Sequence, residues 1–133
     1  MEELRSREHR HGLIPVSDLL PRAGADAAHT VNHPGNTVLR GLAERVLERL
    51  GRTAAVPDPG RTLLDAVHAP LAADVLEALG IDAEPSEHWV LAGRTVPDDV
   101  IRDRQLQWYG AHPEVAAAGL ERHAATLRLL ALA

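Results

Sequence analysis

The chain has 133 residues, of which 14 are basic and 19 acidic, with a formal net charge of -5. This acidic balance argues against nucleic acid as the main partner, because binding phosphates requires a basic surface. No apolar run is long enough to cross a bilayer, and the charged first eleven residues are unlike a signal peptide, so we expect a cytoplasmic protein without a membrane span. The absence of cysteine excludes disulfide bonds.

The first part of the chain contains little apolar sequence. Residues 1–12 read as a charged lead-in, helical over Glu2 to Arg10, and residues 13–133 as a single domain. Residues 13–16 predict a short edge strand, because Pro15 cannot donate to a ladder. Ser17 is expected to cap a brief helical turn that Pro21 ends, and residues 27–32 form a second short strand candidate.

The helix from Thr37 to Leu50 is the clearest element, since its apolar residues recur at helical spacing up to a stop at Gly51. Residues 53–60 predict a loop, because they contain two prolines and a glycine. Two helices are expected next, over residues 61–68 and 71–79, separated by Pro70.

In the second half, residues 88–91 are the best strand candidate, and Gly93 and Arg94 form a turn. Thr95 is expected to cap a helix that reaches Tyr109. Pro113 opens a last helix whose apolar stripe contains Ala116, Leu120, Leu127 and Leu130, with His123 as a half-buried packing residue. The fold class is therefore α/β or α+β, mainly helical with few short strands.

Chemistry is concentrated in residues 29–39, H-T-V-N-H-P-G-N-T-V-L. With proline second and glycine third, His33 to Asn36 predicts a β-turn, and Asn36 becomes the N-cap of the following helix. An extended segment would turn His29, Val31 and His33 to one face. On the simplest interpretation this stretch is only a strand, a turn and a cap, with histidines at the surface.

The start of that helix could bind an anion. Its free N–H groups and the helix dipole favour phosphate or carboxylate, and Arg40 lies one turn in. His29 and His33 are spaced like the pair of a zinc-protease helix, but the glutamate is missing and Pro34 disfavours helix at His33. No third ligand joins the two histidines at a recognisable spacing, so we expect no metal site.

The segment H-T-V-N-H-P-G-N-T-V-L with its helix resembles the histidine-rich motif of the WcbI-type polysaccharide biosynthesis proteins, a family of acetyltransferases that bind coenzyme A. The tail, W-Y-G-A-H-P-E-V and the helix after it, resembles the end of actinobacterial members. The resemblance spans roughly residues 13–132 and corresponds to the later part of the family pattern. The first half of that pattern, with a strand and a cysteine-containing loop, has no counterpart in this sequence.

The resemblance implies an acyltransferase, or a component of one, that acts in polysaccharide biosynthesis. Asn32, Asn36 and Arg40 would hold coenzyme A or acetyl-CoA, and His29 or His33 would act as general base on a sugar hydroxyl. A separately encoded N-terminal half is a possible partner. The alternative is a non-catalytic binding or assembly module that retains part of the acyltransferase fold.

Overall fold

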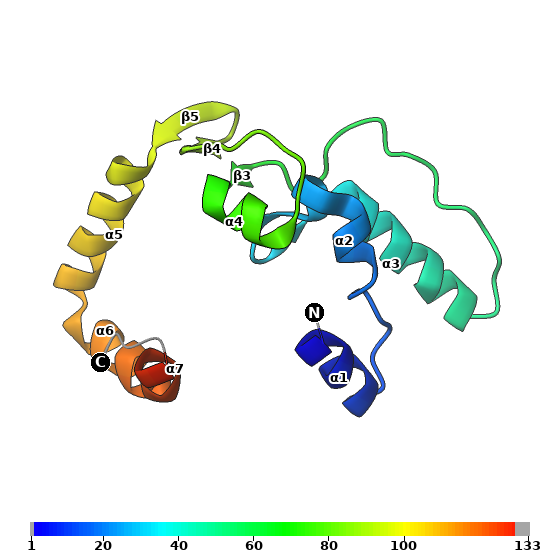
Figure 1. Ribbon diagram of the computed structural model, residues 1–133, viewed down its shortest axis with the longest axis horizontal. Helices are drawn as coiled ribbons and strands as arrows, with labels where there is room; N and C mark the ends of the chain where they lie inside the picture. Colours follow the sequence, from blue (N-terminus) through cyan, green and yellow to red (C-terminus); the bar gives the residue numbers. More distant parts are fainter. Residues whose placement is uncertain (1, 130–133) are drawn as a thin grey trace. The chain divides into compact units, whose positions relative to one another are not determined.

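The computed structural model describes residues 2–129, in which seven α-helices and five short strands occur (Figure 1). The predicted mainly helical fold is confirmed. Within the described residues the strands form a two-stranded and a three-stranded sheet, and the pairings with assigned register are antiparallel. Of the two expected classes, the fold is therefore α+β. The contacts divide the chain into two compact units, Met1–Val96 and Pro97–Ala133.

The first unit begins with α1 (Glu2–Arg10), the helix expected in the lead-in. The strand expected at residues 13–16 is wrong, because this segment is bonded to a side chain and not to a neighbouring strand. The Glu8 carboxylate accepts the backbone N–H groups of Val16 and Ser17 at 2.7 and 2.9 Å. It also accepts the Ser17 hydroxyl at 2.6 Å, so this serine does not cap the next helix.

Helix α2 (Leu19–Ala23) runs through Pro21, which was expected to end it. The expectation is wrong because Pro21 is the third residue of the helix, where a backbone N–H would have no acceptor inside the helix. A 3-10 turn (Gly24–Ala27) follows and leads to β1 (Ala28–Thr30). This strand lies within the one expected over residues 27–32.

A hairpin replaces the turn predicted at residues 33–36. The chain turns at residues 31 and 32, and His33 and Pro34 form β2 (His33–Pro34), antiparallel to β1. Gly35 has φ -74° and ψ 169° and is itself the N-cap, so Asn36 is the first residue of α3 (Asn36–Arg49) and not its cap. Glycine is required at position 35 because of space and not because of its φ. A Cβ there would overlap the backbone carbonyl oxygen of Asp26.

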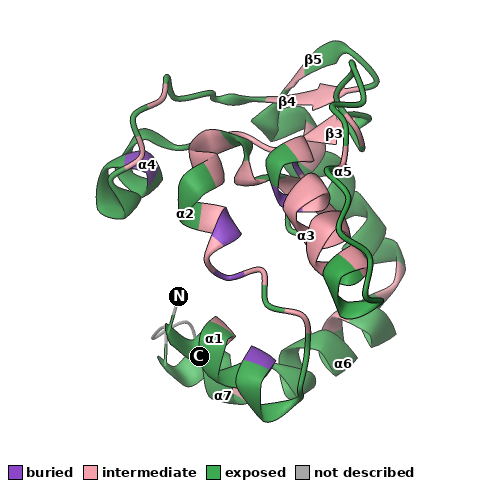
Figure 2. Ribbon diagram, turned by 90° about the vertical axis from the view of Figure 1, so that its right-hand side faces the viewer, coloured by how far each residue is buried: buried purple, intermediate pink, exposed green. Residues whose placement is uncertain are grey.

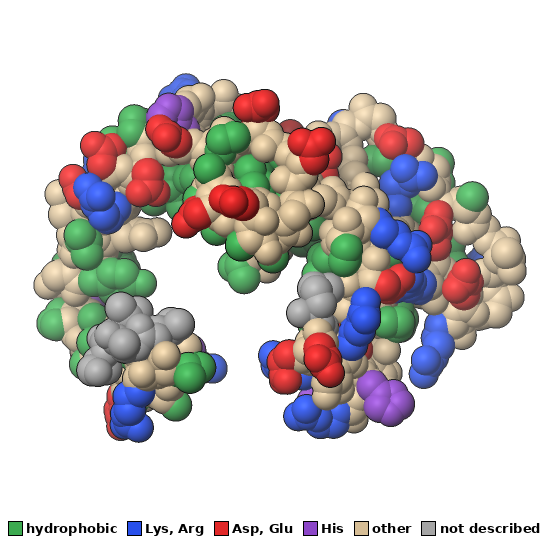
Figure 3. Space-filling model, in the orientation of Figure 1, with side chains coloured by type: hydrophobic (Ala, Val, Ile, Leu, Met, Phe, Trp, Pro, Cys, Tyr) green, Lys and Arg blue, Asp and Glu red, His purple; other side chains and the backbone are tan. Residues whose placement is uncertain are grey.

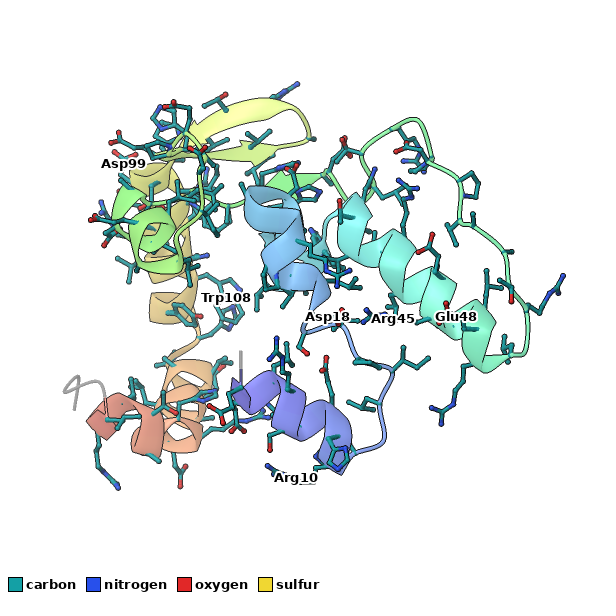
Figure 4. All side chains as sticks on the ribbon, turned by 45° about the vertical axis from the view of Figure 1, so that its right-hand side comes forward. Arg10, Asp18, Arg45, Glu48, Asp99 and Trp108 are labelled. Atoms are coloured by element: carbon teal, nitrogen blue, oxygen red, sulfur yellow. The ribbon has the colours of Figure 1, made fainter. Side chains whose placement is uncertain are left out.

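Helix α3 confirms the prediction for residues 37–50 and packs against α2. Leu19 and Val38 are buried, and Gly41 allows the close approach, because a Cβ there would lie 2.8 Å from a Leu19 methyl carbon. Both terminal nitrogens of Arg45 on α3 donate hydrogen bonds to the Asp18 carboxylate, at 2.6 and 2.7 Å. The two labelled side chains point toward each other in Figure 4. This bidentate pair fixes the start of α2 on α3.

A loop returns from the end of α3 toward its start and enters a small sheet (Figure 1). The sheet contains β3 (Val67–His68), β4 (His88–Leu91) and β5 (Arg94–Pro97) in that order. The strand expected at 88–91 is confirmed. The helix expected at 61–68 is wrong, because the backbone of this segment forms hydrogen bonds with residues distant in sequence. The carbonyl oxygen of Ala66 accepts the N–H of Ala92 at 2.7 Å, and Leu64 has a positive φ of 54°.

Between β3 and β4 lies α4 (Ala73–Leu79), close to the helix expected over residues 71–79. It begins later because Leu71 forms an isolated bridge with Ser86. Gly80 ends α4 in the left-handed conformation, with φ 62°, as the sequence predicted. Leu76 is the buried residue of this helix.

The second unit contains α5 (Asp98–Ala111), α6 (Pro113–Arg122) and α7 (Ala124–Leu129). Thr95 does not cap α5, because it belongs to β5 and the helix begins after Pro97. The last helix opens at Pro113 as predicted but is interrupted at His123, which is exposed and not half-buried. Leu130, the end of the expected stripe, lies outside the described residues. Figure 2 shows these three helices largely in the colour of exposed residues.

Candidate functional site

His29 lies at a β-bulge in the hairpin. Ala28 pairs with Pro34 and Thr30 with His33, so His29 is the extra residue of β1. Bulges redirect a side chain and occur often at functional sites. The single extended segment that would have put His29 and His33 on one face is wrong, because the chain turns between them. The two histidines stand on different strands, and the residue opposite His33 is Thr30.

His68 joins His29 from the second sheet. The imidazole rings of His29 and His68 have centroids 4.1 Å apart and planes tilted by 35°. The backbone N–H of Ala69, next to His68, donates to the carbonyl oxygen of His29 at 2.8 Å. His68 was missed as a site residue because residues 61–68 were expected to be helical. A signal against that helix was present, since the A-V-H-A-P sequence places a β-branched residue and then a proline near its end.

The environment of His29 favours a neutral imidazole. Burial lowers the pKa of His29 below its ordinary value of 6.5, and the neighbouring His68 lowers it further. A backbone hydrogen bond with Leu63 and the charges of Asp26 and Asp65 act in the opposite direction. Over the described residues, Nε2 of His29 and Nδ1 of His33 are buried and lack a hydrogen-bond partner. Buried polar atoms are normally paired, so these two nitrogens are the unusual chemical feature of the site.

Asn36 and Arg40, one turn apart on α3, both contact the returning loop. Nδ2 of Asn36 donates to the carbonyl oxygen of Arg61 at 2.8 Å, and its Oδ1 accepts the N–H of Leu63 at 2.8 Å. The Arg40 guanidinium donates to the carbonyl oxygen of Val56 at 3.2 and 3.3 Å and to the Asp58 carboxylate at 3.3 Å. These two expected ligand-binding side chains hold the loop against α3.

Asn32 lies apart from these contacts, in the hairpin turn. It is exposed, and its Oδ1 accepts the Thr30 hydroxyl at 2.9 Å. The start of α3, with Gly35 as N-cap, follows the hairpin directly. The hairpin, the β3 strand and the start of α3 therefore bring the histidines and the first turn of α3 into one region of the first unit.

A groove of about 510 Å³ lies elsewhere in this unit, between α1 and the segment after it. Charged side chains line it, among them Arg5, Glu8, Asp18 and Arg49, together with His9. Figure 3 shows acidic and basic side chains interspersed over α1 and α3. The candidate residues of the hairpin do not line this groove. Mixed charge of this kind favours no single class of ligand.

Residues 2–129 contain neither a metal-binding cluster nor a membrane-spanning helix. No group of three or more histidine and carboxylate side chains is arranged to hold a metal ion in this range. Nor does any helix in the same residues combine the length and apolar composition that a bilayer span needs.

Comparison with known proteins supports the resemblance of the histidine segment. The family model described as polysaccharide biosynthesis enzyme WcbI matches residues 1–55. The match includes the lead-in, the hairpin and all of α3, and therefore His29, Asn32, His33, Asn36 and Arg40. His68 and the tail that begins at Trp108 lie beyond it. No curated protein and no solved structure matches the chain. Over 55 of its 133 residues, the chain is thus similar to the polysaccharide biosynthesis enzyme WcbI.

Proposed function

We propose that this chain acts in polysaccharide biosynthesis as an acyltransferase, or as a component of one, that uses coenzyme A as the acyl carrier. His29 would be the general base that activates a sugar hydroxyl. The observation that carries this proposal is the buried Nε2 of His29, which has no partner among the described residues and lies in the segment similar to WcbI. An imidazole with an unused nitrogen suits proton transfer near neutral pH.

The proposed reaction is a transfer of acetyl from a thioester to an alcohol. His29 would take the hydroxyl proton at Nε2 while the hydroxyl oxygen forms a bond to the acetyl carbon. The bond from that carbon to sulfur then breaks, and the imidazolium returns the proton to the departing thiolate. The lowered pKa of His29 supports this role, because it favours the neutral imidazole, which is the form that accepts a proton.

The coenzyme would lie at the start of α3. Helix N–H groups favour phosphate, and Arg40 adds a positive charge one turn in. The acidic partner of Arg40 is Asp58, whose side chain is 67% exposed, so an incoming phosphate can replace this carboxylate at little cost. Asn32, exposed on the hairpin turn, is available for a further contact, whereas Asn36 would have to release the loop to make one.

The base role is tested by His29→Gln and His33→Gln, assayed for acetyl transfer from acetyl-CoA to sugar acceptors. Glutamine is polar and of similar size but takes up no proton near neutral pH. We expect His29→Gln to lose activity while folding and coenzyme A binding remain. The assay includes any separately encoded N-terminal partner. Full activity of both variants in a working complex would remove the base role.

Coenzyme A binding is tested by titration calorimetry at low salt. Arg40→Ala should weaken binding, and added salt should weaken it in the parent protein, as expected for a charged contact with phosphate. Arg49→Ala, at the other end of the same helix, is the matched control and should leave affinity unchanged. Absence of binding heat in the parent chain would contradict the proposal for this chain alone.

A second function is a non-catalytic binding or assembly module. It is favoured by one observation, that both amide atoms of Asn36 and the Arg40 guanidinium are engaged in holding the loop. Coenzyme A binding without acetyl transfer, even in the complete complex, would favour this function over the first.

A further inference from the structure

His68 is placed to act on His29 in two ways. Its ring lies against the His29 ring at 4.1 Å between centroids. The next residue, Ala69, donates its backbone N–H to the carbonyl oxygen of His29 at 2.8 Å. The side chain and the backbone of His29 are thus both contacted from β3 and the residue after it. This arrangement joins two sheets that are separate in their strand pairing.

We propose that His68 is a positioning residue for His29: its ring, which lies against the His29 ring, holds the plane of that imidazole, and a second imidazole at this distance disfavours the charged form of His29. The inference rests on the proposed base role of His29 and adds a residue beyond the segment similar to WcbI. His68 itself is not proposed to contact substrate.

Electrostatics follow from this geometry. When two imidazole rings lie this close, protonation of both is unfavourable, because two positive charges at short distance repel each other. His68 accordingly lowers the pKa of His29, second only to burial among the causes. The groups that act in the opposite direction are Asp26 before β1 and Asp65 in the loop, together with the Leu63 backbone. Replacing the His68 imidazole leaves these opposing groups in place.

The test is nuclear magnetic resonance of the histidine rings in the full chain, titrated without substrate. The His29 signal is identified as the one that disappears in His29→Gln. His68→Phe keeps an aromatic ring against His29 but cannot be protonated, so His29 should titrate at higher pH than in the parent protein. Its tautomer, read from the ring nitrogen shifts, should remain that of the parent.

His68→Gln removes both the charge and the aromatic face. Here His29 should also titrate at higher pH, and its ring nitrogen shifts should average between tautomers because the plane is no longer held. His11→Phe, at an exposed position after α1, is the matched control and should leave the His29 titration unchanged.

An unchanged His29 titration in His68→Phe, with thermal unfolding like that of the parent, would overturn the proposal. The phenylalanine variant alone decides this point if the glutamine variant fails to fold. The test is independent of catalysis: a shifted titration in a protein without acetyl transfer would reject the base role of His29 and keep its coupling to His68.

Discussion

Asn36 at the start of α3 binds the backbone of Leu63, 27 positions further along the chain, through its Oδ1 at 2.8 Å. Its Nδ2 donates to the carbonyl oxygen of Arg61 at the same distance. The first residue of α3 therefore fixes the segment that leads into β3 and carries His68 toward His29. A side chain that was expected to cap a helix instead closes a long loop.

Asn36→Ala should lower the free energy of unfolding by about 1–2 kcal/mol, because it removes two hydrogen bonds of roughly 1 kcal/mol each. Asn36→Asp keeps the acceptor for Leu63 and loses only the donor, so its loss should be smaller. Urea denaturation measures both. Thr37→Ala, the exposed neighbour on α3, serves as the control. Equal stability of the Asn36 and Thr37 variants would contradict the anchoring role.

Gly35→Ala should destabilise the protein by about 1–3 kcal/mol, as expected for overpacking of a tight site. A Cβ at this position would overlap the carbonyl oxygen of Asp26, and backbone cannot move as easily as a side chain. Gly110→Ala is the matched control: it lies within α5 and a Cβ there would contact nothing. That variant should keep or raise stability, since alanine favours helix over glycine.

The measurement for both glycine variants is the melting temperature. If Gly35→Ala melts at the same temperature as the parent, the 3-10 turn and the start of α3 do not approach each other as closely as described.

Local patterns predicted the helices with clear periodicity and punctuation. Helix α3 has regularly spaced apolar residues and ends before Gly51, and α4 ends at Gly80 in the left-handed conformation. Where the sequence misled, a non-local bond decided. The Glu8 carboxylate binds the backbone of Val16 and Ser17, which no local pattern reveals. The pairing of Val67 with Leu91 likewise turned an expected helix into a strand.

The candidate site was predictable only in part. The histidine segment stood out by its composition, but the hairpin turn fell at Asn32 and not at Pro34, because Pro34 pairs with Ala28 across the strands. His68 could not be associated with His29 from the sequence, since they meet through contacts between residues 39 positions apart. The approach of such pairs depends on tertiary structure and not on local preference.

Acid should destabilise the first unit through two carboxylates. The Arg45 guanidinium lowers the pKa of Asp18 from 3.8 to about 2, and the Ser17 hydroxyl, with the Val16 N–H, lowers that of Glu8 below 4.5. A lowered pKa in the folded state means that the stabilisation is complete above the unfolded pKa and is lost as pH falls through the folded one. Stability should therefore decrease from about pH 4.5 toward about pH 2.

Asp18→Asn tests this expectation, because asparagine has no charge to lose. Unfolding by urea at several pH values should show a shallower decrease between pH 4 and pH 2 in this variant than in the parent. Asp103→Asn, which affects an exposed pair with Arg102 at 3.6 Å, should keep the parent's slope. An identical slope in the Asp18 variant would contradict the importance of the Asp18 and Arg45 pair.

The helices of the second unit should open more readily than α3. Within their described residues, α5, α6 and α7 contain no buried side chain, and Trp108 remains 50% exposed although its ring contacts those of Tyr109 and His112. Helices with few buried contacts open at low free energy, so their amides should exchange with deuterium faster than those of α3, where Val38 is buried. Hydrogen exchange followed by mass spectrometry measures this difference in the full chain.

Gly119→Ala should slow exchange in α6, because alanine favours helix and a Cβ there meets no neighbour. Equal protection of α3 and α5 would mean that the second unit is stabilised by packing that the described contacts do not contain.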